Sequence, residues 1–314
     1  MKAIILTNAG SVENLELADI PKPDIQSDEV LIKVKAISIN PVDIKTRIGK
    51  SLYNELKDKN NAIILGWDVS GIVEATGKGV TEFKKDDEVF GMVNFPGHGK
   101  AYAEYVAAPA SHLALKPSNI SHEEATAATL AALTAWQAVV TNAKVSKGQK
   151  VVIQAASGGV GHYAVQIAKH LGAYVIATSS AANKDFVISL GADEHIDYKK
   201  HRIDDIVSDA DFVLDPIGDD NIDPSLNAVK KGGTVIMLPS FFKEQIAEKS
   251  KARGVNGFYF SVKSNGDDMK QIAELLAKGI IRSHVSNTFP LDKIREAHLQ
   301  IETGRTVGKI VVTV

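Results

Sequence analysis

Alternating hydrophobic and polar positions fill the first third of the chain in short runs. Every second side chain of a strand faces the same side, so such runs are typical of half-buried strands. The expected strands cover residues 1–7, 29–36, 69–75, 88–93, 101–107 and 113–116. Turn signals such as Pro21-Lys-Pro23 and Gly77-Lys-Gly79 separate them. Strands this short and closely spaced favour a mostly antiparallel, barrel-like domain.

The pattern changes near residues 117–121, where strand-like runs begin to alternate with helical ones. An alanine-rich helix is expected over 122–142, with Ser121 or Asn119 as its N-terminal cap. Strands are expected at 150–154, 174–178, 212–214 and 234–238, with a weaker one at 257–260. Helices are expected at 160–171, 183–190, 224–229 and 267–278. This alternation predicts a doubly wound parallel sheet, which is an α/β fold.

The last thirty or so residues depart from that alternation. A helix is expected over 291–303, and the β-branched run 308–314 reads as a closing strand that rejoins the first domain. We therefore expect one domain from 1–119 and 285–314, and a second from 120–284. Ligands of such sheets bind at the carboxyl ends of the parallel strands, which places the expected site in the cleft between the domains.

A glycine-rich turn follows the first strand of the predicted parallel sheet, in Val151-Val-Ile-Gln-Ala-Ala-Ser-Gly-Gly-Val-Gly161. Gly158 lets the backbone approach a phosphate, and Gly161 lets the next helix pack close to the strand. The free N–H groups at the helix start favour an anion. We predict a dinucleotide pyrophosphate site, and the alternative is an ordinary strand–helix crossover. The turn residues of this expected site are Ala156, Ser157, Gly158, Gly159, Val160 and Gly161.

The end of the second parallel strand decides which dinucleotide is expected. An NAD site places a carboxylate about 20 residues after the glycine turn, to bind the ribose 2′-hydroxyl. This chain has Thr178, Ser179, Ser180 and then Lys184 instead. Small hydrogen-bond donors and one cation suit a 2′-phosphate, so the sequence predicts NADPH rather than NADH. The alternative is a polar turn with a solvated lysine.

Composition and charge exclude several classes of protein. The chain has 314 residues, a net charge of −2 and no cysteine, which rules out disulfides, thiol nucleophiles and cysteine-bound zinc. It has no basic block for nucleic acid, no signal-peptide pattern and no apolar run of about 18 residues. We expect a cytoplasmic protein with no nucleic-acid or membrane partner.

Several motifs occur together along nearly the whole chain. They lie at 36–45, 66–77, 99–105, 133–136, 155–161, 190–193, 196–198 and 305–311. With these motifs the chain resembles the zinc-independent quinone oxidoreductases of the medium-chain dehydrogenase/reductase superfamily. The resemblance implies a Rossmann domain that binds NADP and a GroES-like catalytic domain. It also implies a homo-oligomer, either a dimer or a tetramer, joined along an edge strand of the nucleotide-binding sheet.

The resemblance also shows where the chain departs from the zinc alcohol dehydrogenases. Asn40 stands where those enzymes have a ligand cysteine, and Gly66-Trp67-Asp68 stands in place of Gly-His-Glu. Catalytic zinc needs three protein ligands and an open position, and a tryptophan cannot ligate. We therefore expect no metal. The histidines show no ligand spacing, and His195 and His201 read as loop and helix-start residues.

The resemblance implies hydride transfer from NADPH to a quinone or an α,β-unsaturated carbonyl, because such electron-poor acceptors need no Lewis acid. It places Asn40, Asp43 and Tyr53 in the catalytic site, with no step assigned to Asp43. It places Thr134 near the nicotinamide or pyrophosphate. The alternatives are a turn residue at Asn40, a surface tyrosine at Tyr53 and a packing or capping threonine at Thr134.

The same resemblance frames the adenosine phosphate with Lys184 and Tyr198. It gives Phe241 and Phe242 to an apolar substrate wall, although both could belong to the core or to a subunit contact. Two other functions stay open: a related reductase of enoyl thioesters or carbonyl metabolites, and a non-catalytic protein that binds NADPH.

Overall fold

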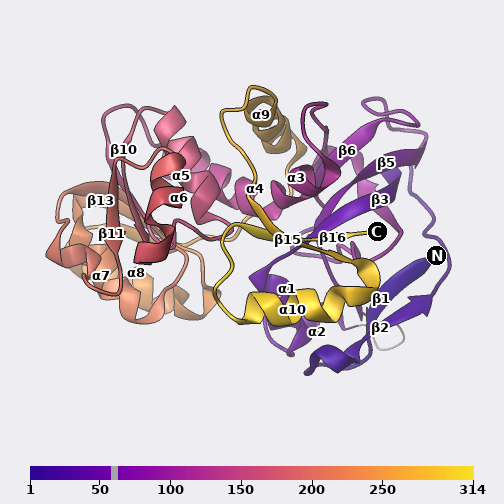
Figure 1. Ribbon diagram of the computed structural model, residues 1–314, viewed down its shortest axis with the longest axis horizontal. Helices are drawn as coiled ribbons and strands as arrows, with labels where there is room; N and C mark the ends of the chain where they lie inside the picture. The colour runs from indigo at the N-terminus through magenta and orange to yellow at the C-terminus, as the bar shows by residue number, and fades with distance from the viewer. Residues whose placement is uncertain (58–62) are drawn as a thin grey trace. The chain divides into compact units, whose positions relative to one another are not determined.

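The computed structural model describes residues 1–57 and 63–314. Two compact units make up the chain: Met1–Leu133 with Lys263–Val314, and Thr134–Val262 (Figure 1). The bounds of these units differ from those of the expected domains, because two helices expected in the second domain belong to the first unit. The first unit takes in α3 (His122–Ala127), which packs on its central strands, and α9 (Gly266–Ala277), which packs on strand β8 (Leu113–Leu115).

A parallel sheet forms the centre of the second unit. Its strands are β9 (Lys150–Ile153), β10 (Tyr174–Ser179), β11 (Glu194–Asp197), β12 (Ala210–Asp215), β13 (Val229–Met237) and β14 (Asn256–Tyr259). They lie in the order β11-β10-β9-β12-β13-β14, and every neighbouring pair is parallel. Chain order reverses between β9 and β12, which makes this a doubly wound sheet, so the predicted fold is confirmed.

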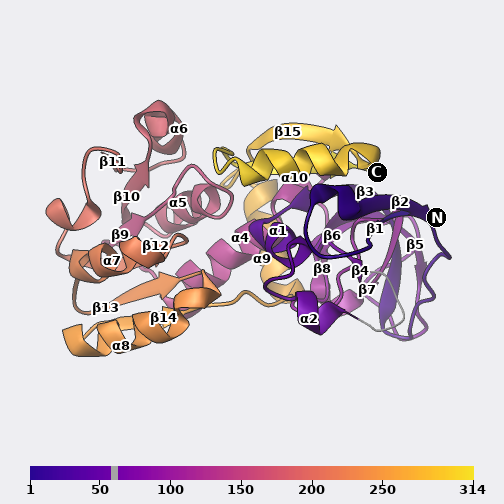
Figure 2. The same ribbon diagram turned by 90° about the horizontal axis from the view of Figure 1, so that it is seen from below.

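Helices connect the strands of this sheet (Figure 2). Helices α5 (Gly161–His170) and α6 (Lys184–Ser189) pack on β9, β10 and β11, whereas α7 (Ile222–Ala228) and α8 (Lys243–Arg253) pack on β12, β13 and β14. The sequence pattern did not predict α8. Its only buried positions are Ile246 and Ser250, too few to create a helical hydrophobic period.

The first unit holds two sheets. The larger runs in the order β15 (Val285–Pro290), β16 (Lys309–Thr313), β3 (Glu29–Ile39), β5 (Asp68–Thr76), β6 (Glu88–Met92) and β8, and β7 (Tyr105–Pro109) also pairs with β3. The smaller joins β2 (Leu15–Asp19), β1 (Lys2–Leu6) and β4 (Ile63–Ile64). All these pairs are antiparallel except β15–β16, so the predicted mostly antiparallel domain is confirmed.

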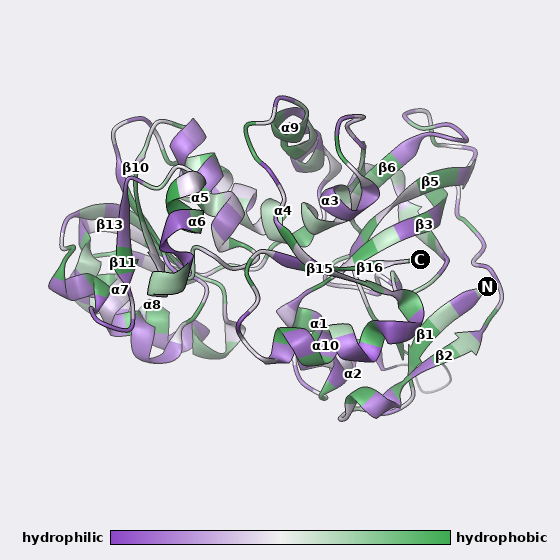
Figure 3. Ribbon diagram, viewed as in Figure 1, coloured by the Kyte–Doolittle hydropathy of each residue, from purple (hydrophilic) through white to green (hydrophobic). Residues whose placement is uncertain are grey.

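The closing strand returns to the first unit, as expected. Strand β16 pairs antiparallel with β3, with Ile310 opposite Ile39. Helix α10 (Ile294–Glu302) precedes it, and Figure 3 shows hydrophilic and hydrophobic residues alternating along that helix. Two short helices that the pattern did not predict, α1 (Pro41–Arg47) and α2 (Tyr53–Leu56), follow β3.

The helix expected over 122–142 is broken in the structure. Helix α3 ends at Ala127, α4 covers Leu130–Trp136, and a π-helical segment covers Gln137–Asn142. At the break, the Thr129 hydroxyl donates to the carbonyl of Thr126, and the N–H of Leu130 donates to Asp68. Helix α4 is hydrophobic along most of its length, as Figure 3 shows. In the described ranges, no helix has the length and apolar content to cross a membrane.

Candidate functional site

The glycine turn lies where the chain order of the parallel sheet reverses. It follows β9, and the neighbouring strands β10 and β12 lie on opposite sides of β9. A Cβ on Gly161 would lie 2.3 Å from the carbonyl oxygen of Ala155, so only glycine allows this approach of helix to strand. The same oxygen accepts from the N–H of Gly158 at 2.9 Å. This closed turn keeps the start of α5 directly beside the end of β9.

The end of β10 holds that turn in place. Thr178 accepts from the N–H of Ala156 through its carbonyl at 2.8 Å and from the N–H of Ala155 through its hydroxyl at 3.3 Å. The side-chain amide of Asn183 donates to the hydroxyl of Ser157 at 3.1 Å. Two strand ends and the following loop therefore form one hydrogen-bonded group. Asn183 was not predicted, because the partner that identifies it lies 26 residues away.

The polar residues after β10 gather with residues of the neighbouring strand β11. The Ser179 hydroxyl lies 2.9 Å from Nε2 of His195, and its carbonyl accepts from the N–H of Tyr198 at 3.3 Å. Lys184, at the start of α6, is exposed and forms no ion pair with another described residue. His195 was expected in a loop, which is wrong: it lies in β11 and faces Ser179.

A buried carboxylate lies at the end of β12, on the other side of the reversal point. Asp215 Oδ1 accepts from the N–H groups of Ile217 and Gly218, at 2.8 and 2.9 Å. Its Oδ2 accepts from the hydroxyl of Ser225, which in turn accepts from the side chain of Gln154. Burial raises the pKa of Asp215. The cluster shapes the loop after β12, and sequence spacing alone did not reveal it.

A second polar cluster is buried in the first unit, around Asn40 at the N-terminus of α1. The backbone N–H of Asn40 donates to Asp43 Oδ2 at 2.7 Å. The side-chain oxygen of Asn40 accepts from the ammonium of Lys309, 2.5 Å away, and its NH₂ donates to Asp68 Oδ2 at 2.7 Å. All four side chains are at most 3% exposed. The amide of Asn40 is therefore held between a cation and an anion.

Asp68 connects this cluster to the helix that follows it. Its Oδ2 also accepts from the hydroxyl of Ser38, while its Oδ1 accepts from the N–H of Leu130, at 2.9 Å. A carboxylate at that place satisfies a free N–H group of the first turn of α4 and suits the positive end of the helix dipole. Burial lowers the pKa of Lys309, and Asp68 and Asp43 act in the opposite direction.

Asp43 has a carboxyl group in an unusual electrostatic state. Burial raises its pKa to about 7, and the negative charge of Asp68 contributes to the rise. Tyr102, which lies beside it, has a pKa raised well above the ordinary value by burial. The Tyr102 hydroxyl is hydrogen-bonded to Nε2 of His298, 3.0 Å away. Burial and the charge of Arg47 lower the pKa of His298 to about 3, which keeps that imidazole neutral.

The other expected site residues lie in more varied surroundings. Tyr53 begins the short helix α2, is half-buried, and has the ammonium of Lys57 5.8 Å from its ring centre. Thr134 is buried within α4. The two phenylalanines separate: Phe241 is 62% exposed, whereas Phe242 packs against the core of the second unit.

Comparison with known proteins adds to this geometry. The model of the alcohol dehydrogenase GroES-like domain matches residues 26–118, and that of the zinc-binding dehydrogenases matches residues 190–312. A 2-methylene-furan-3-one reductase of Solanum lycopersicum is 36% identical over 99% of this chain and 79% of that protein. An NADPH-dependent alkenal/one oxidoreductase of Arabidopsis thaliana is 35% identical over the same shares. The quinone oxidoreductase structure from Coxiella burnetii has a TM-score of 0.94 and 34% identity, and the match covers 100% of this chain and 99% of that one.

The chain belongs to the quinone oxidoreductase branch of the medium-chain dehydrogenase/reductase superfamily. Within this superfamily, the residues at the zinc-ligand positions do not fit zinc. The indole N–H of Trp67 donates to the carbonyl of Gly97 at 2.7 Å, and an indole has no lone pair for a metal. The oxygen of Asn40 already faces the ammonium of Lys309. A zinc ion next to that ammonium would meet a like charge.

The second unit, by contrast, fits the dinucleotide of the superfamily. The space beside Gly161 and Ala155 is one that a side chain would fill, and the N–H groups of the α5 start lie at the reversal point of the sheet. No carboxylate stands in the segment Thr178-Ser-Ser that ends β10. These residues suit a pyrophosphate and a phosphorylated ribose.

The Lys309 cluster leads to a test of stability. Lys309→Met leaves the Asp68 carboxylate buried without its cation, and loss of one partner of a buried pair costs about 3–5 kcal/mol. We expect urea unfolding to show that loss, and Asp68→Asn in the Lys309→Met background to recover part of it. Lys33→Met, an exposed lysine on β3, is the matched control and should have little effect. Equal stability of Lys309→Met and the unchanged protein would refute the role of the ion pair.

Proposed function

We propose that the protein is an NADPH-dependent oxidoreductase that delivers hydride to a quinone or an α,β-unsaturated carbonyl without zinc. The observation that carries this proposal is the glycine turn at the reversal point of the sheet, with Ser179 rather than a carboxylate at the next strand end. The alkenal/one and quinone oxidoreductases among the relatives support it.

The second unit supplies the binding of the cofactor. The turn from Ala156 to Gly161 and the start of α5 would hold the pyrophosphate through N–H groups other than those of Ala156 and Gly158, which donate within the protein. Thr134 would lie close to the nicotinamide or the pyrophosphate. Hydroxyl groups and one cation hold the 2′-phosphate: Thr178, Ser179, Ser180, Lys184 and Tyr198. When bound, the reduced nicotinamide supplies the hydride. The protein then has to orient a flat acceptor over it and exclude water.

The expected catalytic residues belong to the first unit. Asn40 is 2% exposed and its amide is bonded to Lys309 and Asp68, so we assign it to orienting the acceptor or the ribose only through the second lone pair of its side-chain oxygen. Asp43 acts through Asn40, whose backbone it holds, rather than by touching the substrate. Tyr53 stacks on the acceptor or donates a proton to it. Phe241, which is 62% exposed, contributes an apolar wall.

The class of acceptor follows from the charges available. A simple ketone needs strong polarisation of its oxygen, which zinc supplies in the related alcohol dehydrogenases. The ammonium of Lys309 is buried and already bound to Asn40, so it cannot supply that polarisation directly. Quinones and enones accept hydride without it. A reductase of enoyl thioesters is the second candidate, because a thioester enone has the same conjugated acceptor.

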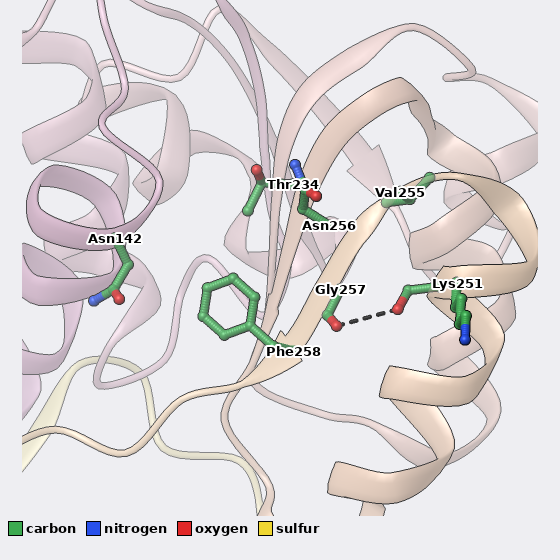
Figure 4. Close-up of a pocket in the computed structure, with 8 residues that line it drawn as sticks. Asn142, Thr234, Lys251, Val255, Asn256, Gly257 and Phe258 are labelled. Carbon is green, nitrogen blue, oxygen red and sulfur yellow. Dashed lines mark hydrogen bonds between the residues drawn. The ribbon is translucent and has the colours of Figure 1, made fainter.

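We also propose that two copies associate through β14. This strand pairs with β13 on one side and ends the sheet order, so its other edge pairs with no strand in the described part of the unit, while the Gly257 carbonyl of β14 accepts from the Ser250 hydroxyl of α8. Figure 4 shows the ring of Phe258 directed from β14 toward Asn142. Both residues line a depression of about 590 Å³. Light scattering should give twice the chain mass; a monomer mass would refute the proposal.

Because the chain has no cysteine, we place the protein in the reducing cytoplasm.

Activity provides the direct test of the function. NADPH absorbance should fall with 9,10-phenanthrenequinone and with 2-hexenal, and treatment with a metal chelator should leave the rate unchanged. We expect Tyr53→Phe to lower kcat for at least one of these acceptors, because the hydroxyl is lost while the ring remains. Turnover of crotonyl thioester alone would favour the second candidate. NADPH binding without turnover of any acceptor would refute the catalytic proposal.

Cofactor choice provides a second test. Ser179→Asp places a carboxylate where the 2′-phosphate is expected, and like-charge contacts cost several kcal/mol. We expect the ratio of kcat/KM for NADPH to that for NADH to fall at least about tenfold, since the carboxylate also accepts from a 2′-hydroxyl. Ser189→Asp, which adds the same charge at an exposed position of α6, is the matched control. An unchanged ratio in Ser179→Asp would contradict the assignment.

A further inference from the structure

One histidine, His195, contacts Ser179 of the proposed cofactor-selection site. Strands β10 and β11 run parallel, with Ala177 beside His195 and Ser179 beside Asp197. Side chains two residues apart on a strand share a face, so all four lie on one face of the sheet. The contact of 2.9 Å between the Ser179 hydroxyl and Nε2 of His195 is a hydrogen bond across that face. His195 is partly buried and Ser179 is 2% exposed.

The hydrogen atoms in this contact can be arranged in two ways. A hydroxyl has one hydrogen to donate and two lone pairs that accept. If Ser179 donates to His195, it presents only lone pairs to an incoming anion. If Nε2–H of His195 donates to Ser179, the serine hydrogen is directed to the carbonyl of Ser180, which lies 3.1 Å from the hydroxyl oxygen. From there it can turn to a phosphate oxygen while His195 keeps hold of the serine oxygen.

A phosphate selects the second arrangement, because its oxygens accept hydrogen bonds and do not donate. Hydrogen bonds that run in one direction, from imidazole to hydroxyl to anion, also polarise one another. Two charged groups neighbour this arrangement. Asp197, on the same face, accepts from the N–H of Lys199 at 3.1 Å, and Lys184 on the adjoining helix adds a positive charge.

We propose that His195 is a positioning residue for the 2′-phosphate: it donates to Ser179 and so makes the serine hydroxyl a donor to that phosphate. This inference rests on the proposed NADPH site. It extends that site by a residue that does not itself touch the cofactor. A ribose 2′-hydroxyl can both donate and accept, so binding of a cofactor without the 2′-phosphate does not depend on the direction of the contact. His195 therefore contributes to selectivity rather than to dinucleotide binding in general.

Calorimetry with two small probes tests the proposal without catalysis. Adenosine 2′,5′-bisphosphate carries the 2′-phosphate, and 5′-AMP lacks it. His195→Phe keeps a ring of similar size and removes the donor. We expect it to weaken the bisphosphate about tenfold, the scale of one hydrogen bond to a charged group, and 5′-AMP less than about twofold. His195→Gln restores an N–H donor and should bring bisphosphate affinity back to within about threefold of the unchanged protein.

A double-mutant cycle separates an indirect role from a direct one. In the Ser179→Ala background, His195→Phe should have almost no further effect on bisphosphate affinity, because the hydroxyl through which it acts is absent. A full additional loss there would mean that the imidazole touches the phosphate itself, and would overturn the proposal. An equal loss for both probes in His195→Phe would also overturn it, since this indicates a purely structural role. His201→Phe, at an exposed histidine of the following loop, is the control and should change neither affinity.

The same experiment keeps this inference apart from the proposed function. If the unchanged protein binds 5′-AMP as tightly as the bisphosphate, the NADPH site itself is wrong. If it prefers the bisphosphate and His195→Phe keeps that preference in full, only the role of His195 is wrong. Thermal unfolding of each variant confirms that the affinities refer to folded protein.

Discussion

The structure of the first unit depends on the contacts of the buried Lys309 ammonium. It comes from the last strand of the chain and reaches the carbonyl of Ile39 and the side chain of Asn40, about 270 residues earlier. Burying an ammonium costs several kcal/mol unless partners replace its water. Here the partners are a carbonyl, an amide and, 3.9 Å away, the carboxylate of Asp68. The cation is stable only when β16 has paired with β3, so closing the chain and fixing the site are one event.

Two residues beside the Lys309 ammonium also lie at the N-termini of helices. Asn40 precedes α1, and Asp68 binds the first free N–H group of α4. In the superfamily's zinc enzymes a metal would organise ligands at these positions. Here a protein cation, an amide and a carboxylate organise each other, and Trp67 is turned to Gly97. This arrangement limits the chemistry, because a cation that is fully bound to protein groups cannot polarise a substrate oxygen. The acceptor must bring its own reactivity, as quinones and enones do.

Local signals in the sequence were enough to predict much of this. The turn from Ala156 to Gly161 is specified by residues that are neighbours in the chain, and the strand–helix alternation follows from periodicity. The break between α3 and α4 could not be predicted, because Asp68, which accepts from the N–H of Leu130 at the break, lies 62 residues away. His195 was missed for the same reason: its partner Ser179 lies on another strand, 16 residues earlier. Helix α8 was missed because it has almost no buried face.

The hydrogen bonds around β10 connect the residues proposed to bind the pyrophosphate with those proposed to select the cofactor. Thr178 holds the backbone of the glycine turn, and Ser179, the next residue, faces His195. Asn183, just before Lys184, ties the following loop back to Ser157 in the turn. A shift of the strand end by a fraction of an ångström would therefore move both sets of donors at once. The buried hydrogen-bonding groups of β10 and the turn have few alternative partners. A substitution that moves the backbone therefore breaks these bonds, whereas one that changes only the charge of a side chain leaves the backbone of the turn in place. In the proposed site, selectivity can then vary through the side chains of β10 and β11 while the glycine turn stays the same.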